Sequence, residues 1–387
     1  MLISTSQKGL QALIDRLASF CEGRGLSVNV EKTKVVVFGS RSMLKNSLIF
    51  RDMKIEQVVS FRYLGLELHQ SGSFKMAATM LLESARKATF GLHSRCAALH
   101  INDPKLKCKL FDALVRPILS YGCEVWSMDT GLGEEMEKWH RKFMRTILKL
   151  PSHSVSSMVY GELGRMPLHH QWYKQLLRFW NQLLGTSNEL LRAALIENSR
   201  MTREALQSGF DHEHRWCSQV EKLIVQYSGP GPLSMYEELD IQHYSKLFHD
   251  SFRVAALSSE SSMSIYYKMF KQTHKYSEYL SEVKNLHLRA MLTRFRSGCH
   301  WLQVNEGRYS DVPKDMRFCP NCPLVVEDEG HFLIKCPAYS CIREKFEHLK
   351  LHSYTDVAKL FKECSDYKEL AKFMVLCRES RSKLLRS

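Results

Sequence analysis

Long hydrophobic runs are missing from this 387-residue sequence. No window approaches the roughly 20 apolar residues that a helix needs to cross a bilayer, so we expect no membrane-spanning segment. The first residues, Met1 to Ser6, contain no basic stretch followed by an apolar run, which argues against a secretory signal. We therefore expect a nuclear or cytoplasmic protein that is not secreted.

Acidic residues are in short supply relative to basic ones. The chain has 55 Lys and Arg against 41 Asp and Glu, which gives a formal net charge of +14. A positive field over the whole molecule favours a polyanionic partner, and nucleic acid and an acidic membrane surface both fit that description. Charge alone does not choose between the two.

Repeats of fixed period and low-complexity tracts are absent, and the hydrophobic share of 44% is ordinary for a globular protein. The twelve cysteines are mostly scattered. In a chain without a secretory route we expect reduced thiols rather than a disulfide framework.

The first 70 residues have the pattern of an α+β fold. Apolar residues at helical spacing predict a helix over residues 7–22. Strands are indicated by a β-branched run, by two short apolar pieces and by alternating leucines. They lie at residues 35–38, 48–50, 58–59 and 61–68, in that order.

Residues 74–150 have the pattern of successive helices. Three apolar stripes predict buried helix faces, and Pro117 and Pro151 predict where the second and third helices end. A later helix is predicted around Trp172, while residues 229–232 and 258–264 predict breaks. The three stripes are Ala78, Leu81, Leu82, Ala85, Ala88 and Leu92; Leu106, Leu110 and Leu114; and Met136, Trp139, Phe143, Ile147 and Leu150.

Four potential metal ligands lie close together in the sequence: Cys319, Cys322, His331 and Cys336. Two cysteines separated by two residues can bind one metal ion from a tight turn, and the His and third Cys would complete a tetrahedron. Zinc accepts thiolate and imidazole ligands and prefers four of them in a structural site. The spacing therefore predicts structural Zn²⁺ with a role in folding.

Alternatives to this ligand set remain open at the level of the sequence. The cysteines could be unrelated buried residues, and Cys341 or Cys299 could replace one member of the set. Three acidic residues beside the cluster, at positions 327–329, are expected to be solvated charges rather than ligands.

Several segments near the cluster resemble a known family. Arg317–Cys322, Val326–Leu333 and Cys336–Tyr339 are similar to the C-terminal segment of reverse transcriptases from non-LTR (LINE-type) retrotransposons. Leu292–Gly298 resembles the basic segment that precedes the zinc cluster in those proteins.

Upstream segments resemble the same family in the same order. Gly25–Lys34 is similar to polymerase motif D, and Phe61–Gly65 is similar to motif E, the primer-grip hairpin. Arg116–Pro117 and Tyr121–Trp126 resemble the helical thumb.

The resemblance implies an α+β chain in which a truncated polymerase palm remnant precedes a mostly helical thumb and a C-terminal region with a small zinc module. The expected parts are a partial palm at 1–72, a thumb-like region at 73–151, a helical region of unknown role at 152–285, a basic segment with the zinc module at 286–345, and C-terminal helices with a basic tail at 346–387.

The family's chemistry is phosphoryl transfer by two metal ions held between acidic side chains. The resemblance places those acids upstream of Met1, so we expect no catalytic residue in this chain. The expected function is a reverse-transcriptase-derived fragment that binds RNA or DNA and no membrane. One alternative is a truncated piece of an active RNA-directed DNA polymerase, which would use Mg²⁺ if its upstream half were present; another is a zinc-stapled helical scaffold that binds proteins.

Candidate nucleic-acid contacts follow from the resemblance and from side-chain chemistry. Basic groups contact phosphates without reading sequence, and an aromatic group beside Arg can stack a base. A solvated turn lysine, a tyrosine packed on its hairpin and ordinary solvated helix faces are the structural alternatives. The candidates are Lys32, Lys34, Arg62, Tyr63, Arg141, Lys142, Arg145, Arg294, Arg296 and Trp301.

Four histidines could be considered for catalysis, but no nucleophile with a partner carboxylate is recognisable near them in the sequence. We expect packing or surface roles for His140, His153, His169 and His170.

Overall fold

The computed structural model describes residues 1–39, 44, 46–128, 130–208, 216–228, 237–258 and 262–385. The chain divides into two compact units, Met1–Ser84 and Ala85–Ser387. Helices predominate, and the described residues form small two-stranded sheets. This mixture agrees with the predicted α+β class.

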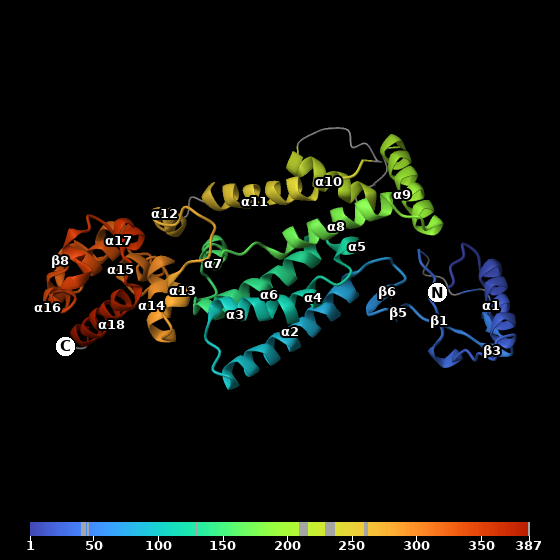
Figure 1. Cartoon of the computed structure of the whole chain (residues 1–387), viewed down its shortest axis with the longest axis horizontal. Coiled ribbons are helices and arrows are strands. Elements are labelled where there is room, and N and C mark those ends of the chain that lie inside the picture. The colour runs from blue at the N-terminus through green and yellow to red at the C-terminus, as the bar shows by residue number, and fades with distance from the viewer. Residues whose placement is uncertain are drawn as a thin grey trace. The chain divides into compact units, whose positions relative to one another are not determined.

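Among its described residues, the first unit combines helix α1 and the start of α2 (Lys75–Ala98) with three small sheets (Figure 1). Its elements are α1 Gln7–Glu22, the short 3-10 helix η1 Val30–Lys32, β1 Lys34–Val35, β2 Ile49–Phe50, β3 Met53–Lys54, β4 Glu56–Gln57, β5 Ser60–Tyr63 and β6 Leu66–His69. β1 and β4 run parallel, whereas β2 with β3 and β5 with β6 are antiparallel pairs.

The predicted helix over residues 7–22 is confirmed as α1. The Ser6 hydroxyl accepts a hydrogen bond from the Gly9 amide at 3.1 Å and so caps its first turn. Ile14 on this helix packs into a small core whose other buried members come from the strands and their flanks: Val35, Leu48, Phe50 and Ile55.

Three strand predictions in this unit need correction. The run 35–38 pairs only at Lys34–Val35, and residues 58–59 lie between β4 and β5 rather than in a strand. The segment 61–68 is a hairpin rather than one strand, because Leu64 (φ 48°) and Gly65 (φ 91°) are both left-handed. Two consecutive left-handed residues reverse the chain in a tight hairpin.

The second unit is built from helices, with one small sheet near its C-terminal end. Helix α2 spans Lys75–Ala98, so it begins in the first unit and ends in the second. The following helices are α3 Pro104–Leu114, α4 Arg116–Leu119, α5 Cys123–Trp126, α6 Thr130–Leu148, α7 Ser156–Leu163, α8 Leu168–Leu184, α9 Glu189–Ser208, α10 Trp216–Ser228, α11 Ile241–Ser258 and α12 Ser262–Lys268.

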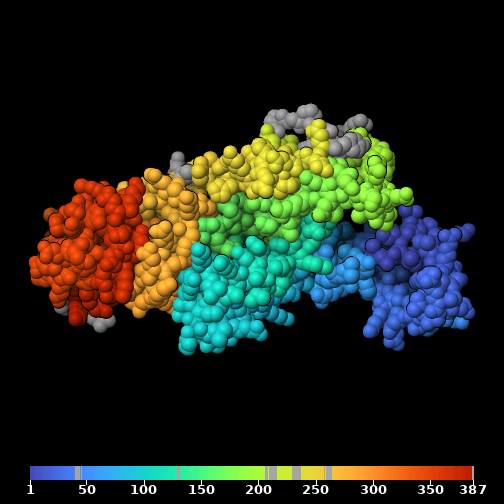
Figure 2. Space-filling view, viewed as in Figure 1, coloured from blue at the N-terminus to red at the C-terminus, as the bar shows by residue number. Residues whose placement is uncertain are grey.

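The C-terminal part of this unit carries shorter elements. They are α13 Tyr279–Glu282, α14 Leu286–Arg296, α15 Gln303–Glu306, η2 Lys314–Met316, β7 Phe318–Cys319, β8 Cys322–Val326, η3 His331–Lys335, η4 Pro337–Tyr339, α16 Ser340–Glu344, η5 Glu347–Leu349, η6 Leu351–Ser353, α17 Val357–Glu363 and α18 Tyr367–Leu384. Figure 2 shows the side chains of this part, orange to red, filling one continuous body.

Two of the three predicted stripes are buried. Those of α2 and α6 are enclosed, with only Ala88 and Trp139 half-exposed. The stripe on α3 is wrong, because Leu106 and Leu114 are exposed. The buried face of that helix consists instead of Pro104, Cys108 and Phe111.

Helix α8, predicted around Trp172, is the centre of the helical packing. It contacts α5, α6, α9, α10 and α11, and Trp172 and Trp180 are fully buried. The predicted break at residues 229–232 lies outside the described residues, as does the middle of the one at 258–264. Among the described helices, none has the length and apolar character that a bilayer crossing demands.

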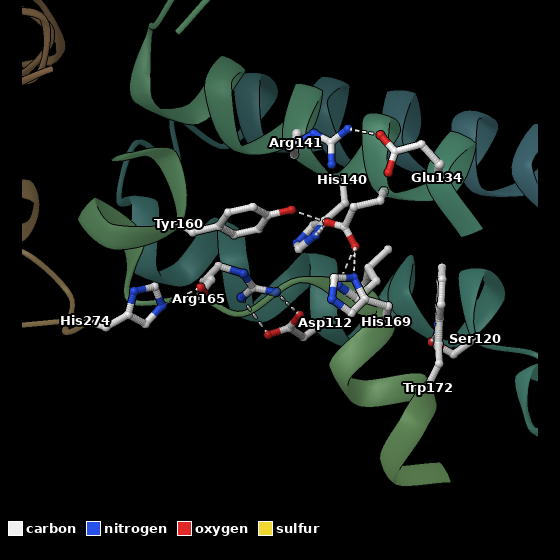
Figure 3. A network of polar contacts seen from close by, with 12 residues as sticks. Asp112, Ser120, Glu134, His140, Arg141, Tyr160, Arg165, His169, Trp172 and His274 are labelled. Carbon is white, nitrogen blue, oxygen red and sulfur yellow. Dashed lines mark hydrogen bonds and ion pairs between the residues drawn. The ribbon is translucent and has the colours of Figure 1, made fainter. Parts of the chain in front are cut away.

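A buried carboxylate joins three helices in the middle of this unit. Glu137 on α6 lies 3.0 Å from His140 Nδ1, accepts a 2.6 Å hydrogen bond from the Leu168 amide at the start of α8, and accepts another from the Tyr160 hydroxyl of α7. Burial acts to raise the pKa of Glu137, but the hydrogen bonds from His140 and Tyr160 outweigh it and hold the pKa at about 2. Figure 3 shows His140, Tyr160 and His169 gathered in this network.

Gly164 tests how tightly α7 is packed. It ends that helix with φ 60°, and a Cβ added there would lie 2.9 Å from the Lys275 carbonyl carbon. We expect Gly164→Ala to lower the free energy of unfolding by about 2 kcal/mol or more, because strain and overpacking combine. Chemical denaturation measures this.

Gly91 is the matched control, because it lies within α2 and a Cβ there meets nothing within 4 Å. We expect Gly91→Ala to be neutral or to stabilise by up to about 1 kcal/mol. Equal effects at both positions would contradict the packing argument.

His170 makes stability depend on pH. Burial, followed by the nearby His169, lowers the pKa of His170 to about 3, whereas an unfolded histidine has a pKa of about 6.5. The unfolded chain therefore takes up a proton first as the pH falls, and stability is lost from about pH 6.5 towards pH 3, by at most about 1.4 kcal/mol per pH unit. We expect His170→Phe to flatten the dependence of the unfolding free energy on pH between 6 and 4.

The exposed His352 provides the control, because its side chain lies in solvent. His352→Phe should leave the pH dependence as in the unchanged protein. A His170→Phe variant with the original slope would show that this histidine does not carry the effect.

Candidate metal centre and basic groove

The first two candidate ligands sit on a hairpin. Cys319 ends β7 and Cys322 begins β8, and the two residues face each other in the antiparallel register. The Asn321 amide donates to the Cys319 sulfur at 3.5 Å. The tight turn between the cysteines therefore directs a backbone N–H at a sulfur, as a metal-binding Cys-x-x-Cys turn requires.

The other two candidates come from the next segment. His331 begins η3, a single turn of wide π-type helix, and Cys336 follows its last residue. Such turns occur often at functional sites. The side chains of Cys319, Cys322, His331 and Cys336, hereafter the metal cluster, are all buried, and their ligand atoms lie within 4.8 Å of one another.

The geometry of the metal cluster fits zinc. With Zn–S bonds of about 2.3 Å, two sulfurs of a regular tetrahedron lie about 3.8 Å apart, and the sulfurs of Cys322 and Cys336 are 3.8 Å apart. His331 Nε2 is buried without a hydrogen-bond partner, which leaves it free to bind a metal ion. The four residues could thus hold one ion in a closed, structural site.

The thiols themselves are not poised for nucleophilic chemistry. Burial raises the pKa of Cys336 to about 12 and also raises the pKa of Cys319. Buried thiols of this kind stay protonated and inert, whereas a bound divalent cation favours thiolates. The four side chains could therefore hold a metal ion, with loss of the thiol protons on binding.

Two of the three acidic neighbours are not the solvated charges that we expected, whereas Asp328 is exposed. Glu327 is fully buried and accepts hydrogen bonds from Arg381 at 2.6 and 2.7 Å. Asp328 accepts from the His331 amide at 2.6 Å, and Glu329 lies 2.8 Å from His300 Nε2. Asp328 thus contacts a member of the metal cluster, and among the described residues none of the three acids belongs to the ligand set.

The open alternatives for a ligand resolve in favour of the original set. Cys341 is exposed, and neither it nor the buried Cys299 belongs to the group of ligand atoms found among the described residues. The binding of zinc itself stays a prediction.

A groove beside the metal cluster brings together two of the predicted nucleic-acid contacts. Arg294 and Trp301 line it with Lys149 and Arg378, over apolar side chains that include Met291, and its volume is about 360 Å³. The Arg378 guanidinium lies 4.5 Å from the centre of the Trp301 ring. We call these four residues the basic groove.

The basic groove is fixed to the metal cluster by aromatic packing. The Phe295 ring stacks on Phe332, the neighbour of His331, at 5.6 Å, and meets the Trp301 ring edge-on at 5.3 Å. A change in the metal cluster should therefore reach the groove through these rings.

Arg296 does not serve as a nucleic-acid contact in this structure. Its side chain is buried and makes two 3.1 Å hydrogen bonds to the buried carboxylate of Glu162. The rings of Phe270 and Tyr279 enclose the guanidinium. The residue stabilises the fold, because a buried charge that loses its partner costs several kcal/mol.

The predicted contacts on α6 have different surroundings. Arg141 pairs with Glu134 at 2.5 Å, and Arg145 is held by Ser154 and Ser156. Lys142 is exposed, with its ammonium group 5.1 Å from the centre of the Trp139 ring. The two arginines are thus engaged within the protein, and Lys142 faces solvent.

The candidates in the first unit lie on its surface or at a sheet edge. Lys32 is exposed, and its amide is capped by the Asn29 side chain at 2.9 Å. Lys34 pairs with Glu56 at 2.5 Å. Arg62 is exposed on β5, and Tyr63 is half-buried next to the hairpin tip.

Sequence reasoning missed two features. Arg378 lies far along the chain from Trp301, and nothing in the sequence links them. The pairing of Glu137 with His140 could have been found, because residues three apart share a helix face. The expected packing role of His140 is thus incomplete, since it does have a partner carboxylate.

Comparisons with known proteins give one modest similarity. No family model matches the chain, and no solved structure matches it. An uncharacterized transposon-derived protein of Caenorhabditis elegans is 28% identical over 155 residues, which cover 38% of this chain and 50% of that protein. The chain spans about half the length of the curated relative that it matches.

Replacing two ligands tests the metal cluster. We expect the protein to hold about one zinc ion per chain and the Cys319→Ser/Cys322→Ser double variant to hold almost none, because a hydroxyl is a poor substitute for thiolate. Because zinc binding is coupled to folding, the double variant should also melt at a lower temperature. Elemental analysis and thermal unfolding measure the two effects.

Cys341→Ser is the matched control, since this neighbouring thiol is exposed and outside the cluster. It should retain both the zinc and the melting temperature. Full zinc content in the double variant would show that other residues bind the metal.

Proposed function

We propose that this chain is a nucleic-acid-binding segment derived from the reverse transcriptase of a non-LTR (LINE-type) transposable element. The similarity to a transposon-derived protein supports an origin in a mobile element. The finer assignment rests on the resemblance of the motif D, motif E, thumb and zinc segments. On this proposal, residues 1–72 are a palm remnant and residues 73–151 a thumb.

The basic groove is the observation that carries the binding function. Lys149, Arg294 and Arg378 supply three cations beside the Trp301 indole, and the chain has an excess of positive charge overall. Cations contact the phosphate backbone without reading sequence, while guanidinium and indole planes can stack on unpaired bases. The groove therefore suits single-stranded RNA or DNA better than a protein surface.

The metal cluster has a supporting role in this proposal. Zinc would hold η3 and the β7–β8 hairpin in place. The contacts of Phe295 with Phe332 and with Trp301 would then restrict the movement of the groove side chains. Preorganised side chains bind with a smaller entropy loss than mobile ones. Zinc removal should then weaken nucleic-acid binding without the metal touching the ligand.

Single-residue changes in the groove test the proposal. We expect Arg294→Ala to weaken binding to a single-stranded RNA oligonucleotide of mixed sequence. The slope of log K against log salt should become shallower by about 0.7, because one phosphate contact is lost. Fluorescence anisotropy over a salt series measures both quantities.

Two controls separate binding from folding. Arg192→Ala removes an exposed charge from α9, outside the groove, and should leave the slope unchanged. Arg296→Ala should lower stability by about 3 kcal/mol or more, because it strands the Glu162 charge. The protein-binding scaffold would be favoured instead if the slope of log K against log salt for RNA were the same in Arg294→Ala as in the unchanged protein. The absence of any salt-dependent RNA binding would favour it as well.

A further inference from the structure

A second basic pocket lies in the helical body, lined by residues other than those of the basic groove. It is formed by α3, α6, the segment between α7 and α8, and α8 and α11, and its volume is about 280 Å³. We call it the histidine pocket, after the imidazoles of His140 and His170 in its wall. Its charged lining residues are Asp112, Arg116, Arg165 and Lys174.

The charge of the histidine pocket is positive. Arg165 makes a bidentate pair with Asp112, at 2.9 and 2.5 Å, and Arg116 lies 3.6 Å from the same carboxylate. Two cations therefore share one acidic side chain, and the Lys174 ammonium, a third cation, has no part in that arrangement. Such a lining attracts an anion and opposes a metal ion.

Two imidazole nitrogens in the wall lack partners. His140 is fully buried, yet its Nε2 has no hydrogen bond, and the same is true of His170 Nδ1. A buried polar group left unpaired costs about 1–3 kcal/mol. A ligand that makes hydrogen bonds with these nitrogens would remove this cost.

The orientation of the His140 ring is fixed by the contact of its other nitrogen, Nδ1, with Glu137. Its Nδ1 lies 3.0 Å from the Glu137 carboxylate, which also accepts hydrogen bonds from the Tyr160 hydroxyl and the Leu168 amide. A carboxylate on one ring nitrogen sets the orientation of the ring, so that Nε2 is left for a ligand. Figure 3 shows His140, Arg165 and Asp112 in this network.

The start of α8 also lines the pocket, through Leu168, the first residue of this 17-residue helix. The partial positive charge of this helix end is already matched by Glu137, which accepts from the Leu168 amide, so the charge of the pocket comes from its Arg and Lys side chains. The metal alternative is disfavoured, because the group of metal-ligand atoms found among the described residues is the Cys319 cluster alone.

From these observations we propose that the histidine pocket binds a phosphate group. Arg116 and Lys174 supply its charge, and His140 Nε2 shares a hydrogen bond with one phosphate oxygen or P–OH group. A tetrahedral oxyanion accepts several hydrogen bonds at once and is small enough for the pocket. The group could belong to a free phosphate or phosphomonoester, or to the backbone of a nucleic acid.

The first test uses inorganic phosphate and the full-length protein. We expect isothermal titration calorimetry at pH 7 to show saturable binding that chloride at equal ionic strength does not reproduce. Lys174→Ala should weaken it about tenfold, equivalent to about 1.4 kcal/mol. His140→Phe should also weaken it. The phenyl ring can still stack on Phe111 but has no nitrogen to hydrogen-bond the phosphate.

Controls keep this test independent of folding and of the groove. Lys174 is only half-buried, so its variant should fold even if His140→Phe does not, and circular dichroism checks both. Arg192→Ala, which removes an exposed charge outside both pockets, should bind phosphate as the unchanged protein does. The proposal would be overturned if phosphate binding did not saturate, or if phosphate bound only as an adventitious ion that chloride replaces. Equal phosphate affinity in Lys174→Ala and in the unchanged protein would also overturn it.

A second arm identifies the source of the phosphate. If Lys174→Ala weakens binding of a 5′-phosphorylated mononucleotide but not of an unphosphorylated RNA oligonucleotide, the ligand is a terminal or free phosphate. If it weakens RNA binding as well, the pocket holds a backbone phosphate. Because inorganic phosphate is the primary probe, the two proposals can fail separately. The histidine pocket can fail to bind phosphate while the basic groove still binds RNA, and the groove can fail to bind RNA while the pocket still binds phosphate.

Discussion

The buried ion pair between Glu327 and Arg381 holds the metal-binding segment to the rest of the protein. Glu327 follows the last residue of β8, and Arg381 lies in the last turns of α18. The same carboxylate accepts a hydrogen bond from the Gln303 amide at the start of α15 at 2.8 Å. One charge thus joins the hairpin that carries two cysteines, the segment after Trp301 and the C-terminal helix.

Buried carboxylates act in the same way elsewhere in the helical unit. Glu162 holds Arg296 of α14 and also accepts from the Tyr267 hydroxyl of α12 at 2.8 Å, and Glu137 joins α6, α7 and α8. A buried charge is tolerated only when it is paired and hydrogen-bonded. Each of these acids therefore fixes the position of several helices relative to one another.

This use of charge separates the basic residues into two groups. Ion pairs with carboxylates inside the protein engage Arg296, Arg381 and Arg165. Arg294 and Lys174 remain available at pockets, although Arg294 lies only two residues from Arg296. The net charge of +14 therefore overstates the number of cations that can contact a phosphate. Variants of the paired residues test stability, whereas variants of the available residues test binding.

The sequence by itself determined the local features: helix α1, the stripes of α2 and α6, and the spacing that brings Cys319, Cys322, His331 and Cys336 together. These depend on residues close in the chain, where helical periodicity and the reach of a tight turn fix the geometry. The roles of Arg296 and Arg378 and the pairing of Glu327 and Glu329 follow from the tertiary structure. A charged side chain is solvated or buried according to its partner, and that partner is distant in sequence, as Glu162 is from Arg296 and Glu327 from Arg381.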